Sequence, residues 1–192
     1  MRLGWTLLLL LAASTFPAFG MRNEVVEGNR TSTVRVVIYE DLQCADCTKL
    51  RTLLDEKLLP KYGSKVAFVH RDFPLGKHDW ARQAAIAGRW IYEQNPEIGI
   101  TYRRELMAQQ DHITVQNFKY WLLEFAARNR LDQPGVLASL NDPRLTALVE
   151  QDYQSGVARG VTNTPTVYVG SQSIVETVIY EDLARLIDTE LR

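Results

Sequence analysis

Apolar positions in the first part of the chain predict a strand, a helix and a second strand. Residues 34–39 form a β-branched apolar run, which is typical of a buried strand. Between residues 47 and 59 leucines recur at helical spacing, and we expect Pro60 to end this helix. A second apolar run, at residues 66–71, predicts another buried strand.

The middle of the chain has the apolar spacing of helices. The expected helices cover residues 78–92, residues 101–110, a segment capped by Thr114, residues 134–140, and a segment from Asp142-Pro143 to Arg159. Gly160 is expected to end the last of these helices. Two short strands follow, at residues 166–169 and 173–178, and an amphipathic helix closes the chain at about residues 183–191.

The order of these elements predicts an α/β fold. A strand–helix–strand unit implies a parallel pair, and the two late strands are close enough to form a hairpin. The order matches a thioredoxin fold with an inserted α-helical subdomain at about residues 75–140.

The first residues have the pattern of a secretory signal peptide. A positive start is followed by an apolar stretch and by small residues that end at Gly20, so we expect residues 1–20 to be removed. An uncleaved membrane anchor is the alternative, although the stretch is short for a span of about 20 residues. Residues 21–33 are expected to be an N-terminal linker, and residues 34–192 the folded domain. Export would place the protein in the periplasm or another extracytoplasmic compartment.

The composition limits the classes of binding partner that we expect for this protein. Hydrophobic residues make up 46% of the chain, enough for a sizeable core, and the net charge is -1. This balance gives no basis for binding nucleic acid, and we expect none.

The two cysteines of the chain, Cys44 and Cys47, are three positions apart. A disulfide between them closes so small a loop that it adds little stability, so its role is expected to be chemical. Cys44 follows the first strand and begins a helix, where unpaired N–H groups favour a thiolate. We therefore predict that Cys44 is the attacking sulfur and that Cys47, one turn further in, is the buried resolving sulfur.

Half of a zinc site is the alternative for this motif. Structural zinc needs four ligands, and the three histidines, His70, His78 and His112, are scattered without ligand spacing. We expect no metal and no other cofactor.

Thr164-Pro165 precedes the third predicted strand, and an X–Pro bond is the usual place for a cis peptide. With this segment the chain resembles the DsbA-like branch of the thioredoxin superfamily. The matching residues are 39–47 (YEDLQCADC), 71–75 (RDFPL) with His78, and 160–166 (GVTNTPT).

The resemblance implies that Pro165 is cis and faces the dithiol, and that the backbone of Thr164 pairs with a substrate chain by strand addition. It also implies exchange of disulfides with exported polypeptides and recharging by a membrane quinone-linked partner. A monomer is expected, since no additional dimerisation segment is evident.

Three positions depart from the pattern of this branch. Ala45 replaces a common proline, Asp46 replaces the histidine of strong oxidants, and Ile38 replaces an acid on the strand beneath the site. A carboxylate at position 46 is expected to raise the pKa of Cys44 and to make the dithiol less oxidising than DsbA. Glu40 lies nearer the site and could replace the missing acid, although strand alternation is not expected to place it beneath Cys47.

The predicted function is therefore that of a protein disulfide oxidoreductase, with its role as oxidase, reductase or isomerase left open. A thioredoxin-like binding or chaperone module with a static disulfide is the alternative. A peroxide-reducing relative is less favoured, because no peroxide-activating arginine is evident beside Cys44.

Overall fold

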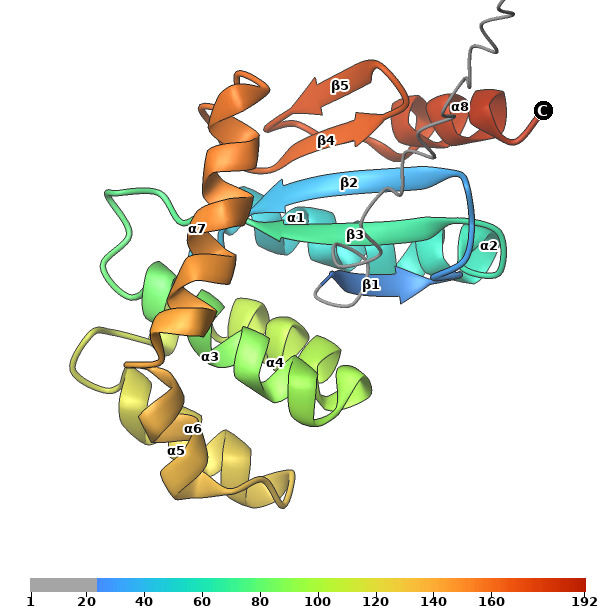
Figure 1. Ribbon diagram of the computed structural model, residues 1–192. Helices are drawn as coiled ribbons and strands as arrows, with labels where there is room; N and C mark the ends of the chain where they lie inside the picture. Colours follow the sequence, from blue (N-terminus) through green and yellow to red (C-terminus); the bar gives the residue numbers. More distant parts are fainter. Residues whose placement is uncertain (1–23) are drawn as a thin grey trace, which may run out of the picture.

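A computed structural model describes residues 24–192 of the chain. Its sheet has five strands in the order β1-β3-β2-β4-β5. The strands are β1 (Val25–Gly28), β2 (Arg35–Glu40), β3 (Ala67–Asp72), β4 (Thr166–Val169) and β5 (Gln172–Val175). β2 and β3 are parallel, and the other neighbours are antiparallel, so the predicted parallel pair and the late hairpin are both confirmed (Figure 1).

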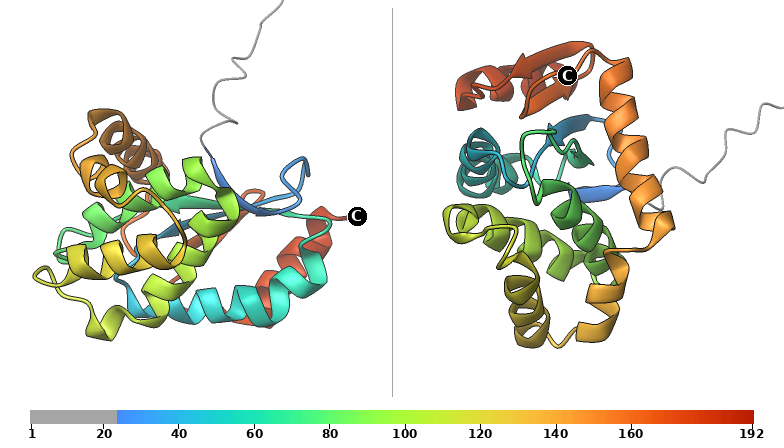
Figure 2. Two further views of the ribbon diagram at one scale, coloured as in Figure 1. Left: turned by 90° about the horizontal axis from the view of Figure 1, so that it is seen from below. Right: turned by 90° about the vertical axis from the view of Figure 1, so that its left-hand side faces the viewer.

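Helices cover both faces of the sheet and extend from one side of it. The helical elements are α1 (Ala45–Leu53), η2 (Leu54–Leu58), α2 (Leu59–Tyr62), α3 (Ala81–Gln94), α4 (Pro96–Ala108), η3 (Gln110–His112), α5 (Phe118–Arg128), α6 (Gln133–Ser139), α7 (Pro143–Ala158) and α8 (Tyr180–Glu190). Helices α1, α2 and α8 lie side by side on one face (Figure 2). The thioredoxin fold with a helical insertion is confirmed.

Alternation along β2 sorts its side chains between the two faces. Val36 and Ile38 are fully buried in the cluster that joins the sheet to α1, η2 and α8. Val37 and Tyr39 point to the other face, where α7 packs through Tyr153. Burial of branched side chains on both faces explains why this strand is a continuous apolar run.

The sequence predicted that the helix beginning after Cys44 ends at Pro60. In the structure it does not end there. It continues through Pro60 to Tyr62, because η2 has π-helical pairing in which the N–H of Leu59 bonds the carbonyl of Leu54. Pro60 then occupies the first turn of α2, where a proline is tolerated.

The segment predicted as a linker also differs. Residues 25–28 form β1, which pairs antiparallel with β3 and covers that edge of the sheet. The folded part of the chain therefore begins before residue 34. The predicted signal peptide, residues 1–20, lies outside the described residues.

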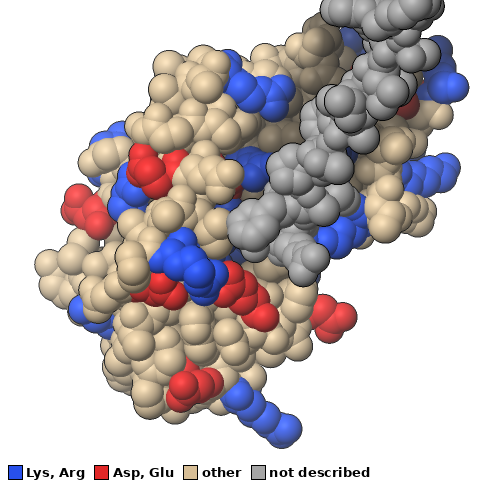
Figure 3. Space-filling model, in the orientation of Figure 1, with Lys and Arg blue, Asp and Glu red and all other residues tan. Residues whose placement is uncertain are grey.

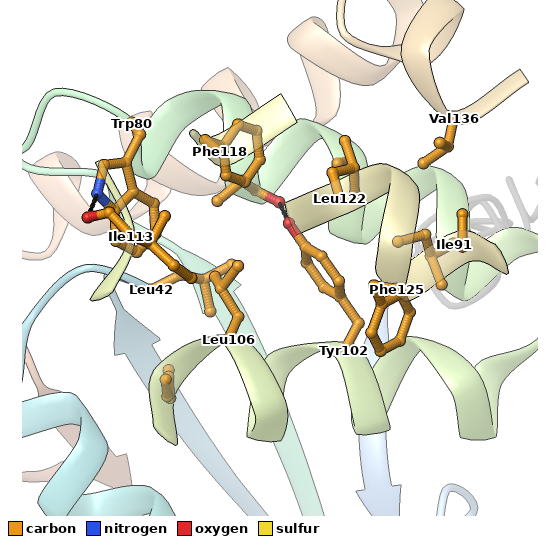
Figure 4. Packing of buried hydrophobic residues seen from close by; sticks show 14 of the residues in the cluster. Leu42, Trp80, Ile91, Tyr102, Leu106, Ile113, Phe118, Leu122, Phe125 and Val136 are labelled. Atoms are coloured by element: carbon orange, nitrogen blue, oxygen red, sulfur yellow. Dashed lines mark hydrogen bonds between the residues drawn. The ribbon is translucent and has the colours of Figure 1, made fainter. Parts of the chain in front are cut away.

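Helices α3 to α6 fall within the segment predicted as the insertion, and they share an apolar core. Buried side chains from α3, α4 and α5 point toward one another there, among them Tyr102, Leu122 and Phe125 (Figure 4). Trp80 and Phe118 are buried in the same cluster. Asn95 caps α4 and Asp142 caps α7, so both helices begin with a capping side chain before a proline.

The surface carries no charged region of one sign on the face that Figure 3 shows; acidic and basic side chains are interspersed there. Between residues 24 and 192, no helix is both long and apolar enough to cross a membrane.

Candidate active site around Cys44 and Cys47

Cys44 and Cys47 lie where β2 leads into α1. Cys44 occupies the N-cap position of α1 with extended backbone angles, and Cys47 is on its first turn. Cys44 is 9% exposed and Cys47 is 0% exposed. Both cysteines are therefore buried, and Cys44 is the more accessible of the two.

The pKa of Cys44 is lowered to about 5. A hydrogen bond from Cys47 is the largest cause, and backbone N–H groups of the first helical turn, those of Cys47 and Asp46, add to it. Donors of this kind favour the thiolate because they bond the charged form. Cys44 is thus ionised at neutral pH and suited to attack or to leave as a thiolate.

Burial raises the pKa of Cys47 well above its ordinary value, and the neighbouring Cys44 and the charge of Glu40 raise it further. The Cys47 sulfur also accepts a hydrogen bond from the backbone N–H of Asp41, with an N–S distance of 3.4 Å. The dithiol therefore holds one thiolate and one thiol at neutral pH.

The expectation that Asp46 raises the pKa of Cys44 is wrong for this fold. The carboxylate of Asp46 pairs with Lys49, with an Oδ1–Nζ distance of 2.8 Å, and 46% of its side chain is exposed. A solvated carboxylate beside an ammonium group has little effect on a neighbouring thiol. The backbone N–H of Asp46 instead helps to lower the pKa of Cys44.

Glu40 lies on the same face of β2 as Ile38, and its charge acts on Cys47. Glu40 therefore influences the pKa of Cys47 from the face of β2 on which the missing acid was expected. Burial alone would raise the pKa of Glu40, but the charges of His70 and Arg103 lower it to about 2. Ile38, two positions earlier, packs in the apolar core.

Glu40 belongs to a buried charge cluster between the sheet and the helices. Its members are Glu27, Glu40, Arg51, His70, Asp72, Arg89, Arg103 and Asp152, each no more than 8% exposed. Each contacts at least one member of opposite charge within ion-pair distance. The sequence did not reveal this cluster, because its members come from separate strands and helices.

The Thr164–Pro165 peptide bond is cis, as the resemblance implied. The Sγ of Cys44 lies 3.3 Å from the carbonyl oxygen of Thr164, to which it donates a hydrogen bond in its protonated form. Thr164 therefore lies directly beside Cys44, although 120 positions separate them in the chain.

The three histidines have different positions. His70 is buried in the charge cluster. His78 contacts Asp41 next to the dithiol, with an Nδ1–Oδ2 distance of 2.8 Å. His112 is exposed at the end of η3. Among the described residues no group of three or more potential ligands has the geometry of a metal site.

Comparison with known protein families matches residues 21–189 to the family described as Thioredoxin. The chain belongs to the thioredoxin family. The match covers the dithiol, the cis-proline segment and the helical insertion of this thioredoxin-family chain.

Solved structures share the same fold, including the insertion. Wolbachia pipientis alpha-DsbA1 superposes with a TM-score of 0.76 at 18% identity, covering 88% of this chain and 91% of that one. BdbD from Bacillus subtilis superposes with a TM-score of 0.74 at 21% identity, covering 89% and 94%. The predicted DsbA-like form of the thioredoxin fold is confirmed.

Two curated proteins resemble the chain in sequence. Disulfide bond formation protein D of Bacillus subtilis is 22% identical over 178 residues, which are 90% of this chain and 79% of that protein. The Na(+)/H(+) antiporter NhaA of Herminiimonas arsenicoxydans is 27% identical over 147 residues, 75% of this chain but 22% of that protein. The chain spans about a fifth of the antiporter, so the antiporter's name assigns no activity to it.

Proposed function

We propose that this protein is a thiol–disulfide oxidoreductase that exchanges disulfides with exported polypeptides through Cys44 and Cys47. The observation that carries the proposal is the contrast between the two sulfurs: Cys44 is 9% exposed with a pKa of about 5, and Cys47 is fully buried with a raised pKa. Disulfide exchange needs this asymmetry, because one thiolate must be reachable while the other sulfur waits to close the disulfide.

In the oxidising direction, a substrate thiolate attacks Sγ of Cys44 in the Cys44–Cys47 disulfide. The S–S bond breaks, a mixed disulfide forms, and Cys47 leaves and takes up a proton. A second substrate thiolate then attacks the substrate sulfur of the mixed disulfide, and Cys44 leaves as a thiolate. The substrate loses two electrons and gains a disulfide, and the dithiol is reduced. The reverse sequence reduces a substrate disulfide.

The pKa of Cys44 supports an intermediate oxidising strength. A pKa of about 5 lies between the values of about 3.5 for DsbA and about 7 for thioredoxin. A more stable thiolate favours the reduced form, so we expect a potential between about -120 mV and about -270 mV, less oxidising than DsbA. The charge of ionised Glu40 raises the pKa of Cys47 and so keeps this sulfur protonated in the reduced dithiol.

The substrate chain is expected to pair with the backbone of Thr164, beside cis-Pro165. A recess of about 100 Å³ lies between α1 and the segment that follows β5, lined by Asp46, Lys49, Leu50, Glu176, Thr177 and Val178. The backbone N–H of Glu176 bonds the carbonyl of Pro165 at 2.7 Å, so one wall of the recess is tied to the cis-proline segment.

We also propose that the protein works as a monomer in the periplasm or another extracytoplasmic compartment, where a membrane quinone-linked partner recharges its dithiol. The printed name of the Bacillus subtilis relative, Disulfide bond formation protein D, supports a role in disulfide formation.

Reduction of insulin by dithiothreitol tests the activity. The wild-type protein should accelerate it, Cys44→Ala should not, and Cys47→Ser should accumulate a mixed disulfide with the substrate. Equal behaviour of wild type and Cys44→Ala would instead favour a binding or chaperone module with a static disulfide. Equilibration with glutathione measures the potential, and a value near -120 mV would exclude the proposed intermediate strength.

A further inference from the structure

Asp41 contacts both cysteines through its backbone. Its N–H donates to the Cys47 sulfur at an N–S distance of 3.4 Å, and its carbonyl accepts the N–H of Cys44 at 3.1 Å. A shift of this one residue would therefore change the surroundings of both sulfurs together.

The side chain of Asp41 is fully buried and is held by donors from two segments. Its Oδ1 accepts the backbone N–H of Gln43 at 2.7 Å. Its Oδ2 accepts the backbone N–H of Leu75 at 2.7 Å and contacts Nδ1 of His78 at 2.8 Å. Of these three donors, His78 is the one side chain, and it is 17% exposed. A buried carboxylate depends on such partners, because each lost hydrogen bond leaves an acceptor without water to replace it.

His78 belongs to the loop between β3 and α3, and this loop contacts the dithiol segment at further points. The backbone N–H of Trp80 donates to Oε1 of Gln43 at 3.1 Å. The Trp80 side chain packs in the same apolar cluster as Leu42 and both cysteines. The loop and the dithiol segment thus form one packed unit, with the Asp41–His78 contact on its more accessible side.

We propose that His78 is a positioning residue for the dithiol: its Nδ1–H donates to Asp41 and so holds the Asp41 peptide against Cys47 and Cys44. The inference rests on the proposed function and deepens it. Without the His78 donor, the Asp41 carboxylate seeks another partner and the Asp41 N–H moves off the Cys47 sulfur. Since the Cys47 hydrogen bond is the largest cause of the low Cys44 pKa, loosening Cys47 raises the pKa of Cys44.

Two substitutions distinguish the loss of the His78 Nδ1 contact from a change in the size or polarity of the side chain. In His78→Asn the amide nitrogen occupies nearly the position of Nδ1, whereas in His78→Gln it lies nearer that of Nε2. Asparagine can therefore donate to Asp41 and glutamine is poorly placed to do so. His112→Asn is the matched control, because the His112 side chain is exposed and no hydrogen bond of the described residues joins it to Asp41 or to either cysteine.

The test is a titration of Cys44 in the reduced full-length protein, followed by thiolate absorbance, with thermal unfolding of each variant recorded alongside. We expect the Cys44 pKa to rise in His78→Gln and to stay near the wild-type value in His78→Asn and His112→Asn. We also expect the equilibrium constant for oxidation of reduced glutathione by the protein to fall by about tenfold in His78→Gln, because a raised Cys44 pKa destabilises the reduced dithiol. A change of this size corresponds to the loss of one hydrogen bond to a charged group.

A purely structural role would lower the unfolding temperature without moving the Cys44 titration, and that result would overturn the proposal. An equal shift in the asparagine and glutamine variants would overturn it as well. The titration does not depend on substrate turnover, so failure of the wild-type protein to reduce insulin would count against the proposed function and not against the role of His78.

Discussion

Arg103 on α4 bridges the acidic side chains Glu40 and Asp72, which end two neighbouring strands. Its Nη2 donates to Oε1 of Glu40 and to Oδ1 of Asp72, each at 2.9 Å. All three side chains are at most 2% exposed. Removing a charged partner from such a site leaves the other charges without compensation in a region of low dielectric.

Arg103→Met should therefore destabilise the protein by about 3 to 5 kcal/mol, since it leaves Glu40 and Asp72 buried without this partner. Urea unfolding of the oxidised protein measures the change. Arg104→Met is the neighbouring control: 41% of the Arg104 side chain is exposed, so its ion pairs should contribute at most about 1 kcal/mol. Equal losses in the two variants would contradict the importance of burial.

Cys44 should make the stability of the reduced protein depend on pH. Its folded pKa of about 5 lies below its ordinary value of 9.0, so ionisation stabilises the folded state. The full gain is present above pH 9 and disappears as the pH falls through 5. At pH 7 the gain is about 3 kcal/mol.

Unfolding of reduced wild type and of Cys44→Ser at several pH values measures this contribution. The difference in stability should shrink between pH 7 and pH 4. A difference that does not change with pH would show that Cys44 is not ionised in the folded protein.

His70 should have the opposite effect on the pH dependence of stability: its contribution should fall as the pH rises. Its pKa is raised because it lies between Glu40 and Glu27, whose charges outweigh the effect of burial. Its contribution is full below the ordinary pKa of 6.5 and is lost as the pH rises through the folded value. His70→Gln should cost about 3 kcal/mol below that pH and less in alkaline solution.

A Cys44→Ser background keeps the thiol titration out of the His70 measurement. Chemical unfolding across the pH range gives the two stability curves. Parallel curves for the histidine and glutamine proteins would contradict a protonated His70.

Gly156 allows α7 to lie close against the sheet face that carries Tyr39. A Cβ at this position would lie 2.7 Å from ring atoms of Phe73 and 3.0 Å from the Tyr39 ring. Gly156→Ala should therefore destabilise by about 1 to 3 kcal/mol, although alanine favours the helix. Thermal unfolding checks this. Gly76→Ala, where a Cβ meets nothing within 4 Å, should change stability by less than about 0.5 kcal/mol.

The sequence predicted the parts of the fold that depend on local pattern. The apolar run of β2, the cap at Asp142 and the stop at Gly160 each follow from residues within a few positions of one another. The place of the two cysteines at the start of a helix also follows from residues within a few positions of one another.

The parts that were missed depend on partners elsewhere. β1 has a polar flank and only four residues, so its pairing is set by the edge of β3 and not by its own composition. Pro60 was expected to end a helix because its effect was judged without the π-helical pairing that precedes it. The error at Asp46 is similar, since Lys49 and solvent determine what that carboxylate does.

The partners of Glu40 and Asp41 were the hardest site contacts to predict from the sequence. Nothing near position 40 indicates that Arg103, 63 positions later, would hold Glu40 ionised. His78 did appear in a recognised motif, but its contact with Asp41 became visible only when the loop after β3 was placed against the dithiol.

The buried charge cluster also limits how the molecule can move. Arg89 on α3 and Arg103 on α4 are ion-paired with Asp72 on β3, so swinging the insertion away from the sheet would separate opposite charges in a region of low dielectric. A hinge motion that moves the insertion as a rigid body away from the sheet is therefore unfavourable in this chain. Substrate access to Cys44 should come instead from small displacements of the loops around it, on the timescale of loop motion.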